Sequence, residues 1–313
     1  MKDNFVPTVL LTTPVLFLIF NRPDTTQKVF NAIRQAKPKQ LFVAADGPRP
    51  DKEGEMEKCE QVRKIIEQVD WDCKLYKDYS DVNLGCKVRP SSGIDWFFKN
   101  VNEGIILEDD CLPNQSFFWF CQELLKYYRD DTRIMTISGN NFQFGKVRGE
   151  GSYYFSKYVH LWGWATWRRA WKYFDVDIKS LDEFKRKNQI INIFRTKQQQ
   201  KYWLKVFQIV YEGKLDAWDY QWVYTCFINN GLCIMPNINL VSNIGFGIDS
   251  THTKDKNSIF SKTEAKDIKN IIHPHFILAN QEADNLDSKL SFGNVSIFTR
   301  LKNKMVRIIS KII

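Results

Sequence analysis

The first 130 residues alternate between continuous apolar runs and amphipathic segments, and this alternation limits the possible folds more than any other feature. Residues 14–21 and 40–48 are such runs, and they end in Asn21-Arg22-Pro23 and Asp46-Gly47-Pro48. Runs of this kind are typical of buried parallel strands followed by turns. The segments between them have apolar residues at helical spacing. The pattern predicts an α/β fold, with a mostly parallel central sheet and helices on both faces.

Further elements are expected at defined places along the chain. The expected helices are 24–36, 57–69, 92–100, 115–128, a Trp-rich helix over 163–174, 198–212 and 218–230. The further expected strands are 73–79, 104–108, 133–139 and one within 233–246. The Gly-rich polar stretch 243–257 has no periodicity, which indicates a loop.

The chain has 313 residues and 43% hydrophobic residues, enough for one large α/β domain. We expect a single domain over residues 1–285, because no Pro/Ser/Gly linker divides it, and a basic amphipathic tail over 286–313. After Asp287 the tail has six Lys or Arg residues and no acid. It suits either a helix on an anionic membrane surface or a helix docked on the domain. Because much of the net charge of +9 lies there, no nucleic-acid partner is expected.

Cysteine spacing and hydropathy bear on location. The seven cysteines form no CxxC pair, which is typical of reduced thiols in the cytosol. The apolar stretch 9–20 contains Pro14 and is too short for a membrane span, and it has no basic leader. We therefore expect a cytoplasmic protein, with the tail as a possible peripheral contact to the inner face of the membrane.

Three consecutive acids, Glu108, Asp109 and Asp110, follow the apolar run 104–107. Adjacent carboxylates repel one another and are costly to desolvate, so such a cluster usually has a compensating cation. Mg²⁺ and Mn²⁺ prefer carboxylate oxygens and often share them with a diphosphate. A solvated acidic turn is the alternative. Ligands of such sheets collect at the carboxyl ends of the strands, so Arg22 and Asp46 should line the same crevice.

Several segments together resemble the GT-A glycosyltransferases. They are PVLFLIFNRPDTT, VAADGP, LEDDCLP, HLWGWATWRRAW and WDYQW. The closest likeness is to bacterial enzymes that are similar to the animal N-acetylglucosaminyltransferase I family, and it covers about residues 12–255. The resemblance implies a GT-A fold and a metal-dependent, inverting hexosyl- or N-acetylhexosaminyltransferase. Its donor would be a nucleotide sugar, with a UDP-sugar as first choice, and its acceptor a glycan or lipid-linked glycan of a surface polysaccharide.

The resemblance also implies roles for single residues of the triplet and of the loop 243–257. Asp110 would coordinate Mn²⁺ or Mg²⁺, while Glu108 and Asp109 would face the ribose and sugar hydroxyls of the donor. His252 could supply a further metal ligand, since neutral imidazole binds Mn²⁺. A solvated loop histidine is the alternative for His252.

The nucleotide contacts would come from segments that precede the triplet. Asn21 and Arg22 would contact the diphosphate or nucleotide, and Asp46 would accept the N–H of a uracil. Arg89 is a candidate phosphate neighbour. The alternatives are a salt bridge at a helix start for Arg22, a turn cap for Asp46 and a solvated surface cation for Arg89.

Asp219 is the expected catalytic base, because an inverting transferase needs a carboxylate that takes the proton of the acceptor hydroxyl. The family pattern often has a second acid next, where this chain has Tyr220. Asp216 is the reserve candidate, and a helix N-cap is the alternative role for either acid. Trp162 and Trp164 could contact the acceptor sugar, whereas Trp164, Trp167 and Trp171 would share a helical face in the core.

Two other functions remain open at this point. A sugar-1-phosphate nucleotidyltransferase would have a similar layered architecture, but Asn21-Arg22-Pro23-Asp24 is not the Gly-rich phosphate loop that such an enzyme needs after its first strand. A non-catalytic nucleotide- or carbohydrate-binding protein at the membrane surface is the third possibility. Hydrolysis of the donor in the absence of acceptor would distinguish it from an enzyme.

Overall fold

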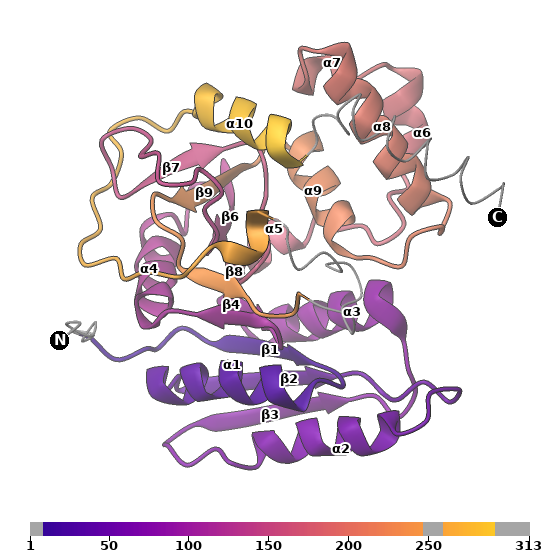
Figure 1. Ribbon diagram of the computed structural model, residues 1–313. Helices are drawn as coiled ribbons and strands as arrows, with labels where there is room; N and C mark the ends of the chain where they lie inside the picture. Colours follow the sequence, from indigo (N-terminus) through magenta and orange to yellow (C-terminus); the bar gives the residue numbers. More distant parts are fainter. Residues whose placement is uncertain (1–8, 247–258, 292–313) are drawn as a thin grey trace, which may run out of the picture.

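An eight-stranded mixed sheet forms the centre of the molecule (Figure 1). The computed structural model describes residues 9–246 and 259–291. The strands of this sheet are β1 (Val15–Ile19), β2 (Gln40–Ala45), β3 (Lys74–Tyr79), β4 (Glu103–Glu108), β6 (Ile134–Ser138), β7 (Tyr153–Ser156), β8 (Trp164–Trp167) and β9 (Leu232–Pro236). Their order is β3-β2-β1-β4-β8-β6-β9-β7. A separate antiparallel pair joins β5 (Cys111–Pro113) to β10 (Val241–Asn243).

Most strands of the sheet run in one direction. β1, β2, β3 and β4 are mutually parallel, β8 is antiparallel to both of its neighbours, and β6 therefore runs in the same direction as β4. β9 is parallel to β6, and β7 is antiparallel to β9. The carboxyl ends of β1, β2, β4 and β6 consequently meet at one edge of the sheet, the edge where ligands of such folds collect.

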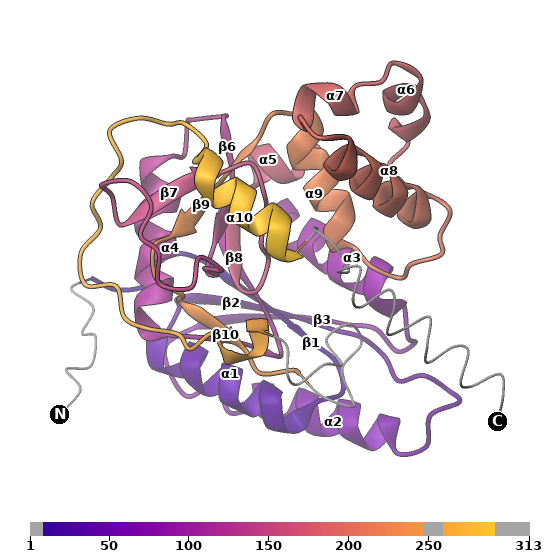
Figure 2. The same cartoon turned by 45° about the horizontal axis from the view of Figure 1, so that its top comes forward.

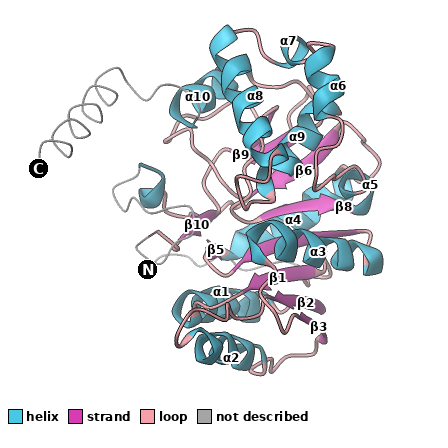
Figure 3. Ribbon diagram, turned by 90° about the vertical axis from the view of Figure 1, so that its right-hand side faces the viewer, coloured by secondary structure: helices cyan, strands magenta, loops and turns pink. Residues whose placement is uncertain are grey.

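Helices cover both faces of the sheet. One face packs against α1 (Pro23–Ala36), α2 (Glu55–Ile66) and α4 (Gln115–Tyr127). The other face packs against α3 (Gly85–Asn100), α5 (Arg168–Trp171), α6 (Leu181–Arg186), α7 (Ile190–Ile193), α8 (Lys197–Tyr211), α9 (Asp219–Ile228) and α10 (Gln281–Ser291). Figure 3 shows α6, α7, α8 and α9 together, away from α1 and α2. The expected α/β fold is confirmed.

The alternation of side chains along β1 divides the core into two layers. Val15, Phe17 and Ile19 belong to the cluster under α1 and α4, whereas Leu16 and Leu18 belong to the cluster under α3. All five side chains are buried, because a parallel strand with helices on both sides has no face toward water. This burial explains why β1 reads as a continuous apolar run.

The expected Trp-rich helix over residues 163–174 is wrong. Residues 164–167 form β8, which pairs with β4 and β6, and only residues 168–171 are helical. Trp164 and Trp167 therefore lie on opposite faces of the sheet, in different core clusters. Two hydrogen-bonded neighbours and burial on both faces outweigh the helical spacing of the tryptophans.

One helix is longer than expected, and one further helix was not expected. α3 begins at Gly85 rather than at residue 92 and has Pro90 within it. α10, yellow in Figure 2, lies beside β7 and crosses the expected domain limit at residue 285. Ala283, Asp284 and Asp287 of α10 are buried, so the helix belongs to the body of the domain. The expected amphipathic tail beyond residue 291 lies outside the described residues. Within the described residues, no helix has the length and apolar character needed to span a bilayer.

Candidate active site

A cavity of about 660 Å³ opens at the carboxyl edge of the parallel strands. Its walls come from the strand ends and from α3, α9 and the segment that precedes α9. The charged residues among its lining are Arg22, Asp46, Arg49, Arg89, Glu108, Asp109, Asp110, Asp216 and Asp219, with His160 beside them. The structure thus brings together most of the residues that the sequence singled out.

Arg22 is the central cation of this cavity. It precedes α1 immediately, and its Nη1 lies 2.9 Å from Asp110 Oδ2 while its Nη2 pairs with Asp109 Oδ1. Asp109 also accepts a hydrogen bond from Phe20 N at 3.3 Å. One guanidinium therefore holds two of the three carboxylates of the triplet, in an arrangement that suits the fork of arginine donors.

The carboxylates of the cavity carry more negative charge than Arg22 can neutralise. Burial raises the pKa of Glu108 to about 8, and the neighbouring charges of Asp110, Asp109 and Asp219 add to the rise. Burial also raises the pKa of Asp109 to about 6, although Arg22 opposes that change. Crowded, desolvated carboxylates of this kind favour a proton or a cation as partner.

Asp46 and Asp216 together satisfy the amino end of α3. Asp46 Oδ1 accepts from Leu84 N at 2.8 Å, and Asp46 Oδ2 accepts from Gly85 N at 3.1 Å. Asp216 accepts from Cys86 N and from the next backbone N–H, at 2.9 and 2.8 Å. The first N–H groups of a helix have no partner within it, and negative charge there is favourable. Asp216 thus caps a helix far from it in the sequence, not the expected helix over residues 218–230, and Asp46 binds the start of the same helix.

Asp46 has two further donors, Gly47 N at 2.9 Å and Asn83 Nδ2 at 3.1 Å. Each of its two oxygens therefore accepts two hydrogen bonds, which is the full capacity of a carboxylate. Burial raises the pKa of Asp46, and the backbone donors oppose the rise. A uracil N–H could bind Asp46 only by replacing one of these donors.

Asp219 is the first residue of α9 and lines the cavity. It follows the capping segment that ends in Ala217-Trp218, and both of those residues are buried. Of the two candidate bases, only Asp216 is committed to the backbone of α3. Asp219 Oδ1 accepts a hydrogen bond from Tyr220 N at 3.0 Å, within the first turn of its own helix.

Asn21 and Arg89 differ in their relation to the cavity. The Asn21 amide donates to Glu55 Oε1 at 2.8 Å, which ties it to the start of α2, and Asn21 is not among the lining residues. Arg89 is buried, lines the cavity and pairs with Asp78, while its Nε has no hydrogen-bond partner among the described residues. The structure thus places Arg89 at the cavity and Asn21 behind it.

Two residues that the sequence reasoning did not select also line the cavity. Asn140 lies just beyond the carboxyl end of β6, and His160 Nε2 lies 3.2 Å from Asp287 Oδ2 of α10. The polar run Gly139-Asn140-Asn141 after a buried strand was the available signal for Asn140, by the argument that selected Asp46. Asp287 could not be connected with His160, because 127 positions separate them in the sequence.

The residues around Asp110 suit a divalent cation that a substrate helps to hold. Among the described residues, no three His, Cys, Asp or Glu side chains form a metal-binding group, and His252 lies outside those residues. Mg²⁺ and Mn²⁺ are often held by one or two carboxylates and by substrate phosphates. Gly245 passes so close that a Cβ at this position would overlap Asp110 Oδ2. Only a residue without a side chain fits this close to Asp110 and Arg22.

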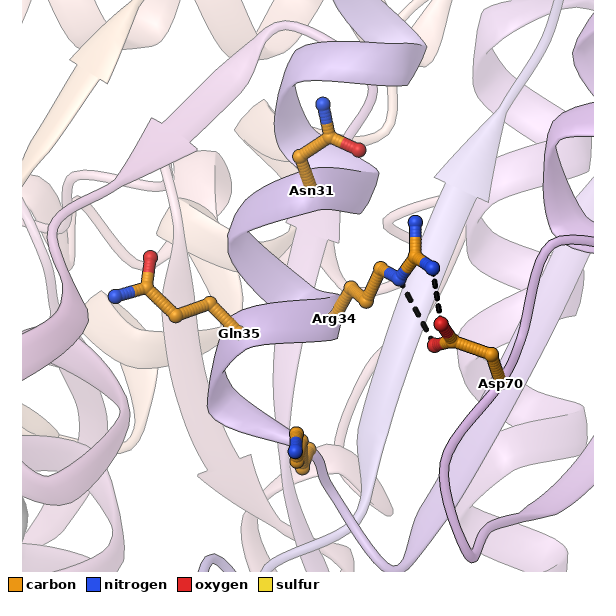
Figure 4. A pocket seen from close by; sticks show the side chains of 5 residues that line it. Asn31, Arg34, Gln35 and Asp70 are labelled. Carbon is orange, nitrogen blue, oxygen red and sulfur yellow. Dashed lines mark hydrogen bonds and ion pairs between the residues drawn. The ribbon is translucent and has the colours of Figure 1, made fainter.

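A second hollow, of about 580 Å³, lies on the outside of α1 and is lined by Asn31, Arg34, Gln35, Lys37 and Asp70 (Figure 4). Arg34 Nε donates to Asp70 Oδ1 at 2.8 Å, and both side chains are exposed. An isolated exposed ion pair of this type contributes little to binding or stability. The hollow is not a candidate active site, but its ion pair is a useful control for that of Arg22.

Comparisons with known proteins give distant structural likenesses. The chain matches no protein-family model and no curated protein. Among solved structures it is similar to HddC from Yersinia pseudotuberculosis, at 7% identity over 50% of this chain and 78% of that chain, with a TM-score of 0.31. It is similar to an active-site mutant of LgtC, at 9% identity over 91% and 97%, with a TM-score of 0.36. It is also similar to the WbbM bifunctional glycosyltransferase in its apo form, at 8% identity over 72% and 39%, with a TM-score of 0.33. Likenesses at this level say nothing of the chemistry, which depends on the residues of the cavity.

Proposed function

We propose that this chain is a GT-A glycosyltransferase that moves a sugar from a nucleotide-sugar donor to a glycan or lipid-linked glycan. The observation that carries the proposal is the meeting of Arg22, the triplet and Asp219 in one cavity at the carboxyl edge of the parallel strands. This edge is where α/β sheets bind nucleotides. A UDP-sugar is the first donor to test.

Donor binding would use the cations and carboxylates of the cavity wall. Asp110 would hold Mn²⁺ or Mg²⁺, which when bound neutralises negative charge on the departing nucleoside diphosphate. Arg22 and Arg89, two of the arginines that line the cavity, would contact phosphate oxygens. Glu108, half-buried in the wall, would accept hydrogen bonds from hydroxyl groups of the donor.

The transfer step itself would depend on Asp219. Its carboxylate accepts the proton of an acceptor hydroxyl while that oxygen forms a bond to the anomeric carbon. The bond from the anomeric carbon to the diphosphate oxygen breaks at the same time, and its electron pair leaves with the diphosphate. Attack opposite the leaving group inverts the anomeric configuration. Asp216 is not available for this role while it caps α3.

Calorimetry with UDP, in the presence and absence of Mn²⁺, tests the proposal. We expect Mn²⁺ to strengthen UDP binding to the wild type and to have no such effect in Asp110→Asn, because the variant lacks a charged oxygen ligand. Asp70→Asn, in the exposed ion pair on α1, is the control and should behave as the wild type. Equal Mn²⁺ dependence in Asp110→Asn and in the wild type would refute the assignment of Asp110.

A peripheral position at the inner face of the membrane is a separate part of the proposal. It depends on the basic tail 286–313, most of which lies outside the described residues. Sedimentation with anionic and neutral lipid vesicles tests it. Binding to anionic vesicles that is lost when residues 296–313 are removed would support the position, and equal binding with and without the tail would refute it.

A further inference from the structure

Asn140 has a buried amide group with one end unpaired. The residue is fully buried, and it follows β6 at the same edge of the sheet as the triplet. Asn140 Oδ1 accepts a hydrogen bond from Trp162 N at 2.9 Å, which fixes the orientation of the amide. Asn140 Nδ2 has no hydrogen-bond partner among the described residues. Since an unpaired buried donor is unfavourable, a partner from outside the protein would explain its place in the cavity wall.

Aromatic side chains line the same cavity as Asn140. Phe142 lies edge to face against Trp162, with ring centroids 5.2 Å apart, and against Phe260, at 4.7 Å. All three rings line the cavity. The wall here is apolar, with few polar groups, which is typical of sites that bury a small organic ring.

His160 completes this part of the wall and is itself held in place. Its ring packs edge to face on Phe142 at 4.7 Å, and its Nε2 lies 3.2 Å from Asp287 Oδ2. Asp287 also accepts from Gln143 Nε2 at 3.0 Å. Asp287 of α10 therefore holds the imidazole of His160 in its orientation.

We infer that Asn140, Trp162 and His160 form a subsite for a pyranose ring. Asn140 Nδ2 donates to a hydroxyl or acetamide oxygen of the sugar, and the indole of Trp162 packs against its C–H groups. The identification of the ligand as a sugar rests on the proposed function. The ring could be the sugar of the donor or the terminal sugar of the acceptor, which present the same chemistry to these residues.

Two binding measurements on Asn140→Ala and Trp162→Phe test the subsite and distinguish the two sources. In the first, saturation-transfer NMR measures the binding of methyl glycosides of glucose, galactose and N-acetylglucosamine in the presence of UDP and Mn²⁺. In the second, calorimetry compares UDP-glucose, UDP-galactose and UDP-N-acetylglucosamine with UDP. For an acceptor subsite, Asn140→Ala should weaken glycoside binding about tenfold, the effect of one lost hydrogen bond. For a donor-sugar subsite, it should reduce the affinity of a UDP-sugar relative to UDP by the same factor.

Asn141→Ala is the matched control, because the Asn141 amide donates to Pro236 O at 2.6 Å and accepts from Gln143 N at 2.8 Å within the protein. We expect this variant to keep both affinities. Trp162→Phe leaves in place the backbone N–H that donates to Asn140. It should weaken binding of the same ligand whose binding Asn140→Ala weakens. The inference is overturned if Asn140→Ala changes neither the glycoside affinity nor the UDP-sugar affinity. It is also overturned if Asn140→Ala weakens the binding of UDP by the same factor as the binding of the UDP-sugar. Failure of the proposed function is a different result, namely no UDP binding by the wild type.

Discussion

Arg22 Nη1 lies 2.9 Å from Asp110 Oδ2, and the same guanidinium also binds Asp109. The side chain of Asp110 that would hold a metal is therefore already paired with a cation of the protein. A divalent ion can reach this oxygen only by sharing it with Arg22 or by replacing Arg22. Arg22 and the metal would then compete in the free protein, whereas a bound diphosphate gives Arg22 a second anionic partner.

Arg22→Gln should lower the stability of the metal-free protein by about 3 kcal/mol, because it leaves two buried carboxylates without their cation. Mn²⁺ should restore part of this loss and should bind the variant more tightly than the wild type. Thermal unfolding in EDTA and in Mn²⁺ measures both effects. Arg34→Gln removes the corresponding arginine of the exposed pair with Asp70 and should change neither (Figure 4). Unfolding of Arg22→Gln at the wild-type temperature in EDTA would contradict this account of the ion pair.

Asp219→Asn should bind UDP with wild-type affinity and lose turnover by a factor of about 10² to 10⁴, the usual contribution of a general base. Asp216→Asn should affect stability more than turnover, since Asp216 caps α3 through two backbone hydrogen bonds. We expect it to lose about 1 kcal/mol of stability and to keep most of its turnover. Rates of UDP release from a UDP-sugar, with calorimetry for UDP, check both variants. If Asp216→Asn lost more turnover than Asp219→Asn, Asp216 would be the better candidate for the catalytic base.

Gly245→Ala should disturb Asp110 specifically, because the new Cβ would overlap Asp110 Oδ2 and lie 2.8 Å from Arg22 Nη1. We expect the Mn²⁺-dependent part of UDP affinity to fall about tenfold, as for a cost of 1.4 kcal/mol at the site. The effect should disappear when Gly245→Ala is combined with Asp110→Asn, which a double-mutant cycle detects. Additive losses in the double variant would mean that Gly245 acts elsewhere.

The raised pKa of Asp284 should make the stability of the protein depend on pH. Burial raises its pKa to about 6 from 3.8, although Ser156 Oγ donates to it at 2.6 Å and Lys157 attracts it; Asp287 adds to the rise. Between these pH values the native state binds a proton that the unfolded state has lost, so this group lowers stability as pH rises from 3.8 to 6. The penalty is complete above pH 6.

Asp284→Asn should remove that penalty. We expect the variant to gain on the order of 2 kcal/mol over the wild type at pH 8, and almost nothing at pH 4. Urea unfolding across this range measures the difference. The exposed acid Asp72 is the comparison, and its change to Asn should give no gain that increases with pH. A constant difference between Asp284→Asn and the wild type at all pH values would rule out titration of Asp284 as the cause.

The elements that the sequence predicts correctly are those with a uniform environment. β1 and β2 are buried on both faces and read as apolar runs. α1 begins with Pro23 and ends at Ala36, and Lys37 after it has the left-handed conformation. β8 could not be recognised in the same way. Its four residues carry two tryptophans at a spacing that also fits a helix, and only its pairing with β4 and β6 makes it a strand.

The candidate site was predictable where one short segment supplies the chemistry. Glu108, Asp109 and Asp110 are adjacent, and Arg22 directly follows the end of a strand. The hydrogen bonds that decide the roles of Asp46 and Asp216 could not be predicted, because they end on the backbone of α3, whose start at Gly85 has no conventional cap. The contact of His160 with Asp287 depends on α10, and no periodic apolar pattern in the sequence predicts that helix.

The cavity draws its walls from positions as far apart in sequence as Leu18 and Phe260. Arg22 follows β1, Asn140 follows β6, and Asp219 begins α9. A fragment that lacks either half of the sheet would keep only part of this arrangement. Turnover of a UDP-sugar, more than binding of UDP alone, would therefore report assembly of both halves of the sheet, and it could serve as a native-state marker during refolding or in truncation series.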